Sequence, residues 1–171
     1  MSEETQGHTV ASTCAEVFEM VTQGDLNIYG TMFGGKLLSM IDKCAGLSAF
    51  RHAGAGVVTV AIDRVEFHRP IRQGAIVTVR SCVNRSFNSS MEVGAVVTME
   101  NPWESVLTPV KVCKAYLTFV ALDPSGKKLA LPPILPETEE EKRRFAQAEI
   151  RRAHRIALSA ELSAEEAKKG A

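Results

Sequence analysis

One stretch of this chain has a clear helical pattern, and every clear pattern after it belongs to strands. Between Asn27 and His52, a glycine-containing turn leads into roughly eighteen residues without proline. Apolar residues recur there at the three- and four-residue spacing of one helical face, at Leu38, Ile41, Ala45 and Ala49. Since glycines follow in the Gly-Ala-Gly turn at 54–56, we expect the helix to end near His52 or residue 53.

The pattern changes to a period of two after this turn. Four runs alternate as strands do, over residues 57–67, 76–87, 90–100 and 109–122. In the first run the apolar residues switch from even-numbered to odd-numbered positions, which predicts a bulge near Asp63. The short Asn88-Ser89-Ser90 link predicts a hairpin between the second and third runs. A weaker alternation in residues 9–21 predicts an additional first strand.

This order of elements predicts one α+β domain. An antiparallel sheet of about five strands has one face to cover, and a single long helix can cover it if the sheet wraps around the helix. The edge strands of such a sheet stay unpaired within one chain. We therefore expect a homodimer in which two sheets join.

Composition excludes several classes of partner. The chain has 171 residues, 45% of them hydrophobic, and its 20 basic and 20 acidic residues cancel. Zero net charge gives no sign of nucleic acid or an anionic membrane as a partner. No leader-like or membrane-spanning run is present, so we expect a cytoplasmic protein without membrane insertion. The four cysteines are scattered, which argues against a metal site and predicts that all are reduced.

The two ends of the chain differ from its middle. Residues 1–8 are polar and are expected to be disordered, residues 9–131 to form the domain, and residues 132–171 to form a Pro-rich linker and a helical tail. Thr138 and Glu141 have capping-box spacing, which predicts a tail helix that runs to about Leu158. Pro102 and Trp103 predict an irregular loop.

The central helix also contains a conflict. Asp42 falls among the apolar positions of one face, where an unpaired charge is costly to bury. A buried structural aspartate and a reactive carboxylate both fit this pattern. Gly34 and Gly35 lower helix propensity near the helix start, which favours either a close approach to the backbone or tight packing. Asn27 lies in the preceding turn, where asparagine often bonds its own backbone.

These motifs together resemble one family. Residues 25–35 (DLNIYGTMFGG), Asp42, the Arg51-His52 pair, residues 57–60 (VVTV), residues 67–71 (FHRPI) and residues 89–93 (SSMEV) are similar to the hotdog-fold acyl-coenzyme A thioesterases of the bacterial YciA and mammalian cytosolic brain-type group. The resemblance covers roughly residues 9–122. It implies the hotdog fold, hydrolysis of acyl-CoA to fatty acid and CoA, and no cofactor beyond the coenzyme A of the substrate.

The resemblance also implies roles for individual residues. Asp42 matches the aspartate taken as general base or nucleophile, and Asn27 matches the asparagine that orients water or substrate from the opposite subunit of a dimer. Gly34 and Gly35 match the backbone that receives the thioester oxygen, which agrees with the free N–H groups of a helix N-terminus. Because members of this group often form trimers of dimers, a hexamer is the implied assembly.

Other candidate residues have two interpretations each. Thr59, Ser89 and Ser90 match the acyl or pantetheine channel, although threonine is also common in strands. Arg51 and His52 either contact a coenzyme phosphate or complement the dipole at the helix end. A non-catalytic acyl-CoA binding or sensing module is the alternative function. A hotdog dehydratase is disfavoured, because the helix carries an aspartate where that class needs its catalytic histidine and acid.

Overall fold

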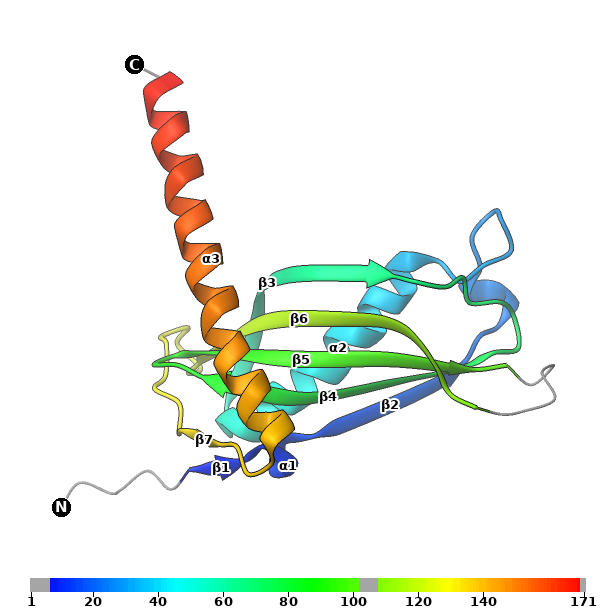
Figure 1. The fold of residues 1–171 in the computed structure, drawn as a ribbon, viewed down its shortest axis with the longest axis horizontal. Helices are drawn as coiled ribbons and strands as arrows, with labels where there is room; N and C mark the ends of the chain where they lie inside the picture. The colour runs from blue at the N-terminus through cyan, green and yellow to red at the C-terminus, as the bar shows by residue number, and fades with distance from the viewer. Residues whose placement is uncertain (1–6, 102–107, 170–171) are drawn as a thin grey trace.

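The computed structural model describes residues 7–101 and 108–169, so the expected loop at Pro102-Trp103 and most of the expected N-terminal disorder lie outside the described residues. A five-stranded antiparallel sheet curls around one long helix, α2 (Gly34–Ala53), while a second long helix, α3 (Glu139–Lys169), crosses the outer face of the sheet (Figure 1). The hotdog arrangement expected from the sequence is confirmed.

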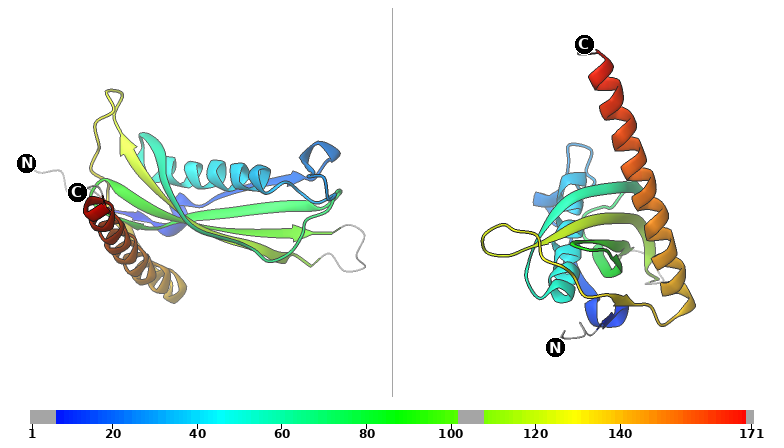
Figure 2. Two further views of the ribbon diagram at one scale, coloured as in Figure 1. Left: turned by 90° about the horizontal axis from the view of Figure 1, so that it is seen from above. Right: turned by 90° about the vertical axis from the view of Figure 1, so that its left-hand side faces the viewer.

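The large sheet has the strand order β2-β4-β5-β6-β3, with antiparallel pairing throughout. Its strands are β2 (Ala15–Met20), β3 (Gly56–Phe67), β4 (Ile76–Ser86), β5 (Ser90–Glu100) and β6 (Val110–Leu122). The hairpin of β4 and β5 is as predicted, and β3 forms one edge of the sheet. The view from above in Figure 2 shows α2 on one side of the curled sheet and α3 on the other.

Two short strands form a separate parallel pair, β1 (His8–Thr9) with β7 (Ile134–Leu135). This pair brings the first of the described residues beside the Pro-rich linker. His8 therefore belongs to a strand, although the sequence placed it in the polar N-terminal segment.

Helix α2 ends where the sequence predicted. Gly54 adopts the left-handed conformation, with φ 60°, and its N–H bonds the Phe50 carbonyl at 2.9 Å. The buried face is rotated slightly from the predicted one: Leu38 is only half-buried, and the buried positions are Leu37, Met40, Ile41, Cys44, Ala45, Ser48, Ala49 and His52. Asp42 lies half-buried at the margin of this face, so its expected place among the core side chains is wrong.

Two strand predictions also need correction. Residues 10–13 form a short helix, α1 (Val10–Thr13), so β2 begins only at Ala15. The Thr13 hydroxyl accepts the N–H of Val83 at 3.0 Å, which fastens this helix to β4. Strand β3 has a register shift at the predicted bulge, between Ile62 and Arg64, and a second one between Thr59 and Ala61 that the sequence did not predict.

Helix α3 is longer than expected. The predicted capping box is present: the Thr138 N–H donates to the Glu141 carboxylate at 3.0 Å, and the Glu141 N–H donates to the Thr138 hydroxyl at 3.2 Å. The helix does not end near Leu158 but continues to Lys169. No helix of residues 7–101 and 108–169 combines the length and apolarity that a membrane crossing requires.

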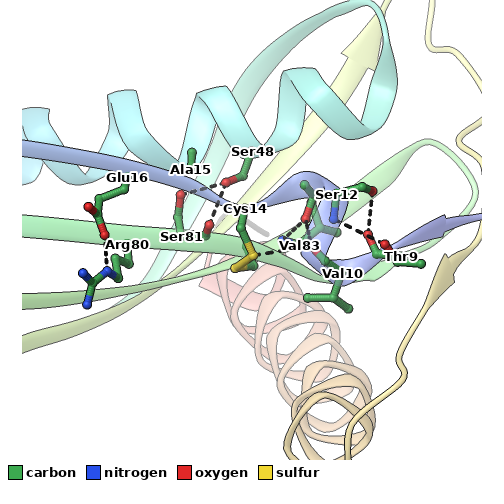
Figure 3. Close-up of a disulfide and its surroundings, with 12 residues drawn as sticks. Thr9, Val10, Ser12, Cys14, Ala15, Glu16, Ser48, Arg80, Ser81 and Val83 are labelled. Atoms are coloured by element: carbon green, nitrogen blue, oxygen red, sulfur yellow. Dashed lines mark hydrogen bonds and ion pairs between the residues drawn. A yellow bond between two sulfur atoms is a disulfide. The ribbon is translucent and has the colours of Figure 1, made fainter.

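The prediction of four reduced cysteines is wrong for one pair. Cys14 and Cys82 form a disulfide between the start of β2 and the middle of β4, with their Cα atoms 4.2 Å apart (Figure 3). The reason is the strand register: Ala15 lies opposite Ser81, so Cys14 lies beside Cys82 despite a sequence separation of 68. Cys44 and Cys113 are free and buried, as expected.

Candidate functional site

Asn27 organises the loop that precedes α2. Its Oδ1 accepts the backbone N–H groups of Tyr29 and Thr31, at 2.9 and 3.3 Å, and its Nδ2 donates to the Thr31 hydroxyl at 3.0 Å. This is the local turn-forming role that the sequence left open beside a role in water binding. The loop tip projects from the protomer, with Ile28 91% and Tyr29 84% exposed. Such apolar exposure is typical of a surface that another chain covers.

Ion pairs fix the start of α2 relative to β2. Lys36, in the first turn, contacts Glu19 at 2.6 Å and Asp25 at 3.2 Å. Hydrogen bonds from the Thr22 hydroxyl and backbone N–H, together with Lys36, lower the pKa of Asp25 to about 2. The Phe33 N–H also donates to the Asp25 carbonyl at 2.8 Å. The N-terminus of the helix is therefore held in one position.

Gly34 and Gly35 begin α2, and their backbone N–H groups have no acceptor among the described residues. A Cβ atom on Gly34 would meet nothing closer than the Phe67 ring at 3.9 Å, so packing within the protomer does not require glycine there. A Cβ atom on Gly35 would lie 2.5 Å from the exposed Phe33 ring. The two amides are available to a negatively charged oxygen, which the dipole of the helix also favours.

A cavity of about 340 Å³ opens beside these amides. It is lined by Gly34 and Leu37 of α2, by Thr31 and Met32 of the preceding loop, and by residues 67–71 after β3. Its lining is mostly apolar, and its polar side chains are Thr31 of the loop before α2 and His68 and Arg69 of the segment after β3. The cavity can take an apolar chain that carries one polar group at its end.

Asp42 lies two turns further along α2 and contacts Thr59 of β3. The Thr59 hydroxyl donates to Asp42 Oδ1 at 2.6 Å. Thr59 pairs with Phe119, whose side chain is buried in the core, so both side chains point to the helix-facing side of the sheet. The sequence assigned Thr59 to a substrate channel and missed this contact. The signal in the sequence was a residue with a hydroxyl group at one of the alternating positions of this strand whose side chains face the helix.

One protomer does not bring all predicted residues together. Asp42 follows Gly34 by eight residues, which separates them by about 12 Å along the helix axis. Asn27 lies in the loop before the helix start, where its side chain bonds Tyr29 and Thr31 and not Asp42. Within one protomer the predicted residues thus fall into two groups, which are called half-sites below: Asn27 and the glycine amides around the start of α2, and Asp42 with Thr59 further along the helix.

The remaining predicted residues lie elsewhere. His52 is fully buried, its Nε2 lies 3.1 Å from the Pro132 carbonyl, and its ring contacts His8 edge to face. Burial, and secondarily the nearby His8, lower the pKa of His52 to about 4. Its ring has no surface to offer a coenzyme phosphate, so that role is wrong. Exposed Arg51 donates to the Cys14 carbonyl.

Ser89 lies in the turn between β4 and β5, and Ser90 is the first residue of β5. Ser90 pairs with Val120 of β6, which in turn pairs with Val58 of β3. Two strand spacings, about 10 Å, therefore separate the serine pair from the Thr59 strand. Among residues 7–101 and 108–169, no group of three or more His, Cys, Asp or Glu side chains is placed to hold a metal ion.

The part of the chain that forms the sheet and α2 is similar to known proteins. Positions 29–103 match the family described as the Thioesterase superfamily. The chain is 31% identical over 144 residues to the cytosolic acyl coenzyme A thioester hydrolase of Homo sapiens, covering 84% of this chain and 38% of that protein. It therefore spans about two fifths of that relative. It is 44% identical to the uncharacterized acyl-CoA thioester hydrolase YkhA of Bacillus subtilis, covering 68% of this chain and 67% of that protein.

Solved structures agree with this relationship. An acyl-CoA hydrolase from Staphylococcus aureus, in complex with butyryl coenzyme A, coenzyme A and coenzyme A disulfide, matches with a TM-score of 0.87 and 32% identity, over 97% of this chain and all of that one. A hexameric acyl-CoA thioesterase matches with a TM-score of 0.86 and 35% identity, over 91% of this chain and 98% of that one.

Three alanine variants of the Staphylococcus aureus protein are also known as structures. They replace an asparagine, an aspartate fifteen residues later, and a threonine seventeen residues after the aspartate. Asn27, Asp42 and Thr59 have these same two spacings. The two half-sites of this chain thus contain the same three residue types at the same intervals.

Proposed function

Because this chain belongs to the thioesterase superfamily, we propose that it hydrolyses acyl-CoA thioesters in a site formed by two copies of the chain. The observation that carries the proposal is the pairing of Asp42 with Thr59, at 2.6 Å, in a half-site separate from Asn27 and the glycine amides. A dimer would supply Asp42 and Thr59 from one copy and Asn27, Gly34 and Gly35 from the other.

Edge strand β3 supports this dimer. It has twelve residues, lies at the edge of the sheet, and leaves Val58, Val60 and Ile62 between 42% and 56% exposed. A long apolar edge with unpaired backbone groups is stabilised by pairing with another strand. Pairing β3 with its copy would join two sheets into one and bring two α2 helices together. Hexameric relatives suggest further assembly as a trimer of dimers.

The chemistry needs no group beyond those of the chain and water. Asp42 removes a proton from a water molecule as the water oxygen attacks the thioester carbonyl carbon. Negative charge then develops on the carbonyl oxygen, which the N–H groups of Gly34 and Gly35 receive. The C–S bond breaks, and the coenzyme A thiolate takes the proton from Asp42. The products are a free carboxylic acid and coenzyme A, so atoms and protons balance.

A panel of acyl-CoA substrates from acetyl to palmitoyl tests this proposal, with release of free thiol as the readout. Asp42→Ala should lose nearly all turnover. Glu139→Ala is the control, because this carboxylate is 91% exposed on α3 and far from either half-site. Unchanged turnover in Asp42→Ala would refute the role of Asp42. Saturable acyl-CoA binding without thiol release by the wild type would favour the non-catalytic module.

Mixing two inactive variants tests the shared site. A dimer of one Asp42→Ala chain and one Asn27→Ala chain contains one intact site and one doubly altered site. Random mixing makes about half of the dimers heterodimers, so about a quarter of wild-type activity should return. Each variant alone should stay inactive. No recovery in a verified mixed dimer would show that the two residues act within one chain.

A further inference from the structure

Helix α3 extends far beyond the sheet that supports its first half. Its 31 residues span about 46 Å. The last ion pair between this helix and the sheet joins Arg155 to Asp63 of edge strand β3, at 2.5 Å. From Ile156 to Lys168 every residue is exposed. Figure 1 shows this part of α3, drawn in red, running past β3 and away from the body of the protomer.

The first half of α3 is firmly docked. Ala148 is fully buried, and Arg151 donates to both oxygens of the buried Glu92 carboxylate, at 2.6 and 2.8 Å. The Arg151 guanidinium also lies 3.7 Å from the centre of the Tyr116 ring. These contacts fix which face of the helix points to the sheet.

That same face continues as Leu158, which lines a cavity with Asp63 and Tyr116 of the same protomer, and as Leu162 beyond it. At about 100° per residue, Leu158 and Leu162 lie within roughly 20° of the direction of Arg151. Both are more than half exposed, at 56% and 52%. Ile156, which is 54% exposed, points about 140° away from that direction. The side of the helix that contacts the sheet thus presents apolar side chains to the space beyond β3.

We propose that residues 156–168 of α3 pack on the outer face of the partner subunit's sheet, with Leu158 and Leu162 as the contacts. The inference rests on the dimer of the proposed function, in which a second copy continues the sheet at β3. The overhang of about 20 Å is as wide as four strands, so it reaches well onto that second sheet. A two-fold dimer contains this contact twice, and each α3 holds the joint of the two sheets from outside.

Charge and stability both agree with a second copy as the occupant. Glu165 and Glu166 flank the side of α3 that carries Leu158 and Leu162. On the outer face of β6, Lys114 has no carboxylate of the described residues within ion-pair distance, so it can pair with a glutamate of the other copy. A helical segment of thirteen residues is marginally stable in water unless its apolar side packs against something. Packing the two exposed leucines against the partner would add apolar burial that the overhang lacks within one protomer.

Hydrogen exchange on the full-length assembly tests the contact. Amides of residues 158–166 should be protected in the wild type and should exchange at least about tenfold faster in the double variant Leu158→Asp/Leu162→Asp. The double variant should also raise the dissociation constant of the dimer by about tenfold or more, measured by sedimentation. Leu158→Asp and Leu162→Asp are also measured singly, with Ile156→Asp as their matched control, since it adds one carboxylate at similar exposure, and Ile156→Asp should change neither quantity.

Several outcomes would overturn the proposal. Fast exchange of residues 158–166 in the wild-type assembly would do so, as would equal effects of the double variant and Ile156→Asp. Dissociation of a hexamer into intact dimers in the double variant would place the contact between dimers instead. Hydrolysis separates this inference from the proposed function: protection in α3 without thioesterase activity refutes only the function, and activity without protection refutes only the contact.

Discussion

The Thr59 hydroxyl donates a hydrogen bond to Asp42 Oδ1 at 2.6 Å, across the gap between edge strand β3 and helix α2. Thr59 stands immediately before a register shift of β3, where the strand turns relative to its neighbour β6. The bond holds one carboxylate oxygen of Asp42. The other oxygen has no partner among the described residues, and in the proposed mechanism it is the one that accepts a proton from water.

Thr59→Val should reduce turnover while the fold persists. Valine has nearly the same volume but cannot donate, so the Asp42 carboxylate loses its fixed orientation. A hydrogen bond to a charged group contributes about 1.5–3 kcal/mol, which predicts a kcat about 10- to 100-fold lower. Thr59→Ser keeps the hydroxyl and should retain most activity. Steady-state thiol release measures both variants, and wild-type kcat in Thr59→Val would rule out a positioning role.

The fold could be predicted because its signals are local. The helical spacing of α2 and the alternation of β3 to β6 depend on neighbouring residues, and the αL glycine at Gly54 ended the helix where expected. The extent of α3 was underestimated, because Arg151, Arg152 and Arg155 form a basic cluster of the kind that often ends a helix, whereas the helix continues to Lys169.

The residue types of the candidate site could be predicted from the sequence, but the contacts between those residues could not. Nothing near Asp42 in the sequence identifies Thr59 as its partner, because β3 and α2 meet only through the curl of the sheet. The burial of His52 depends on the linker at Pro132, eighty positions away. The Cys14–Cys82 bond likewise depends on the register of β2 against β4. Each of these contacts is non-local, so periodicity alone does not contain it.

Removal of the Cys14–Cys82 disulfide should lower the free energy of unfolding. The bond closes a loop of 68 residues in the unfolded chain, and loops of this length predict about 4 kcal/mol, with 2–4 kcal/mol typical. Urea unfolding of Cys14→Ser/Cys82→Ser at fixed protein concentration measures the loss. Wild-type protein in dithiothreitol should lose the same amount, and the variant should not respond to the reductant. Equal wild-type stability in both conditions would contradict the prediction.

Arg151→Met should destabilise the protein strongly. Glu92 is 2% exposed, and Arg151 neutralises it through two hydrogen bonds. Without that arginine, a buried carboxylate stays uncompensated, at a cost of about 3–5 kcal/mol in urea unfolding. Lys142→Met is the control: its ion pair with Glu139 is exposed and contributes less than about 1 kcal/mol. Adding Glu92→Gln to Arg151→Met should recover part of the loss, and no recovery would assign the effect to packing instead.

Acid should weaken the fold through His52. Burial holds the pKa of His52 at about 4 in the folded chain, and its Nδ1 has no partner in the structure described, whereas the unfolded pKa is near 6.5. As the pH falls from 6.5 to 4, the unfolded chain therefore binds a proton that the folded chain does not. The free energy of unfolding should fall across this window by about 3 kcal/mol in total, and this contribution should level off below pH 4.

Urea unfolding of the wild type and His52→Gln from pH 4 to pH 8 isolates this effect. Glutamine can still donate to the Pro132 carbonyl that faces His52 Nε2, but it does not titrate. Carboxylates titrate in both proteins over the same range, so they cancel in the difference between the two curves. The His52→Gln curve should be flatter between pH 6.5 and 4, and above pH 7 the two curves should run parallel. Identical slopes in the acid window would show that His52 binds its proton equally well in the folded chain.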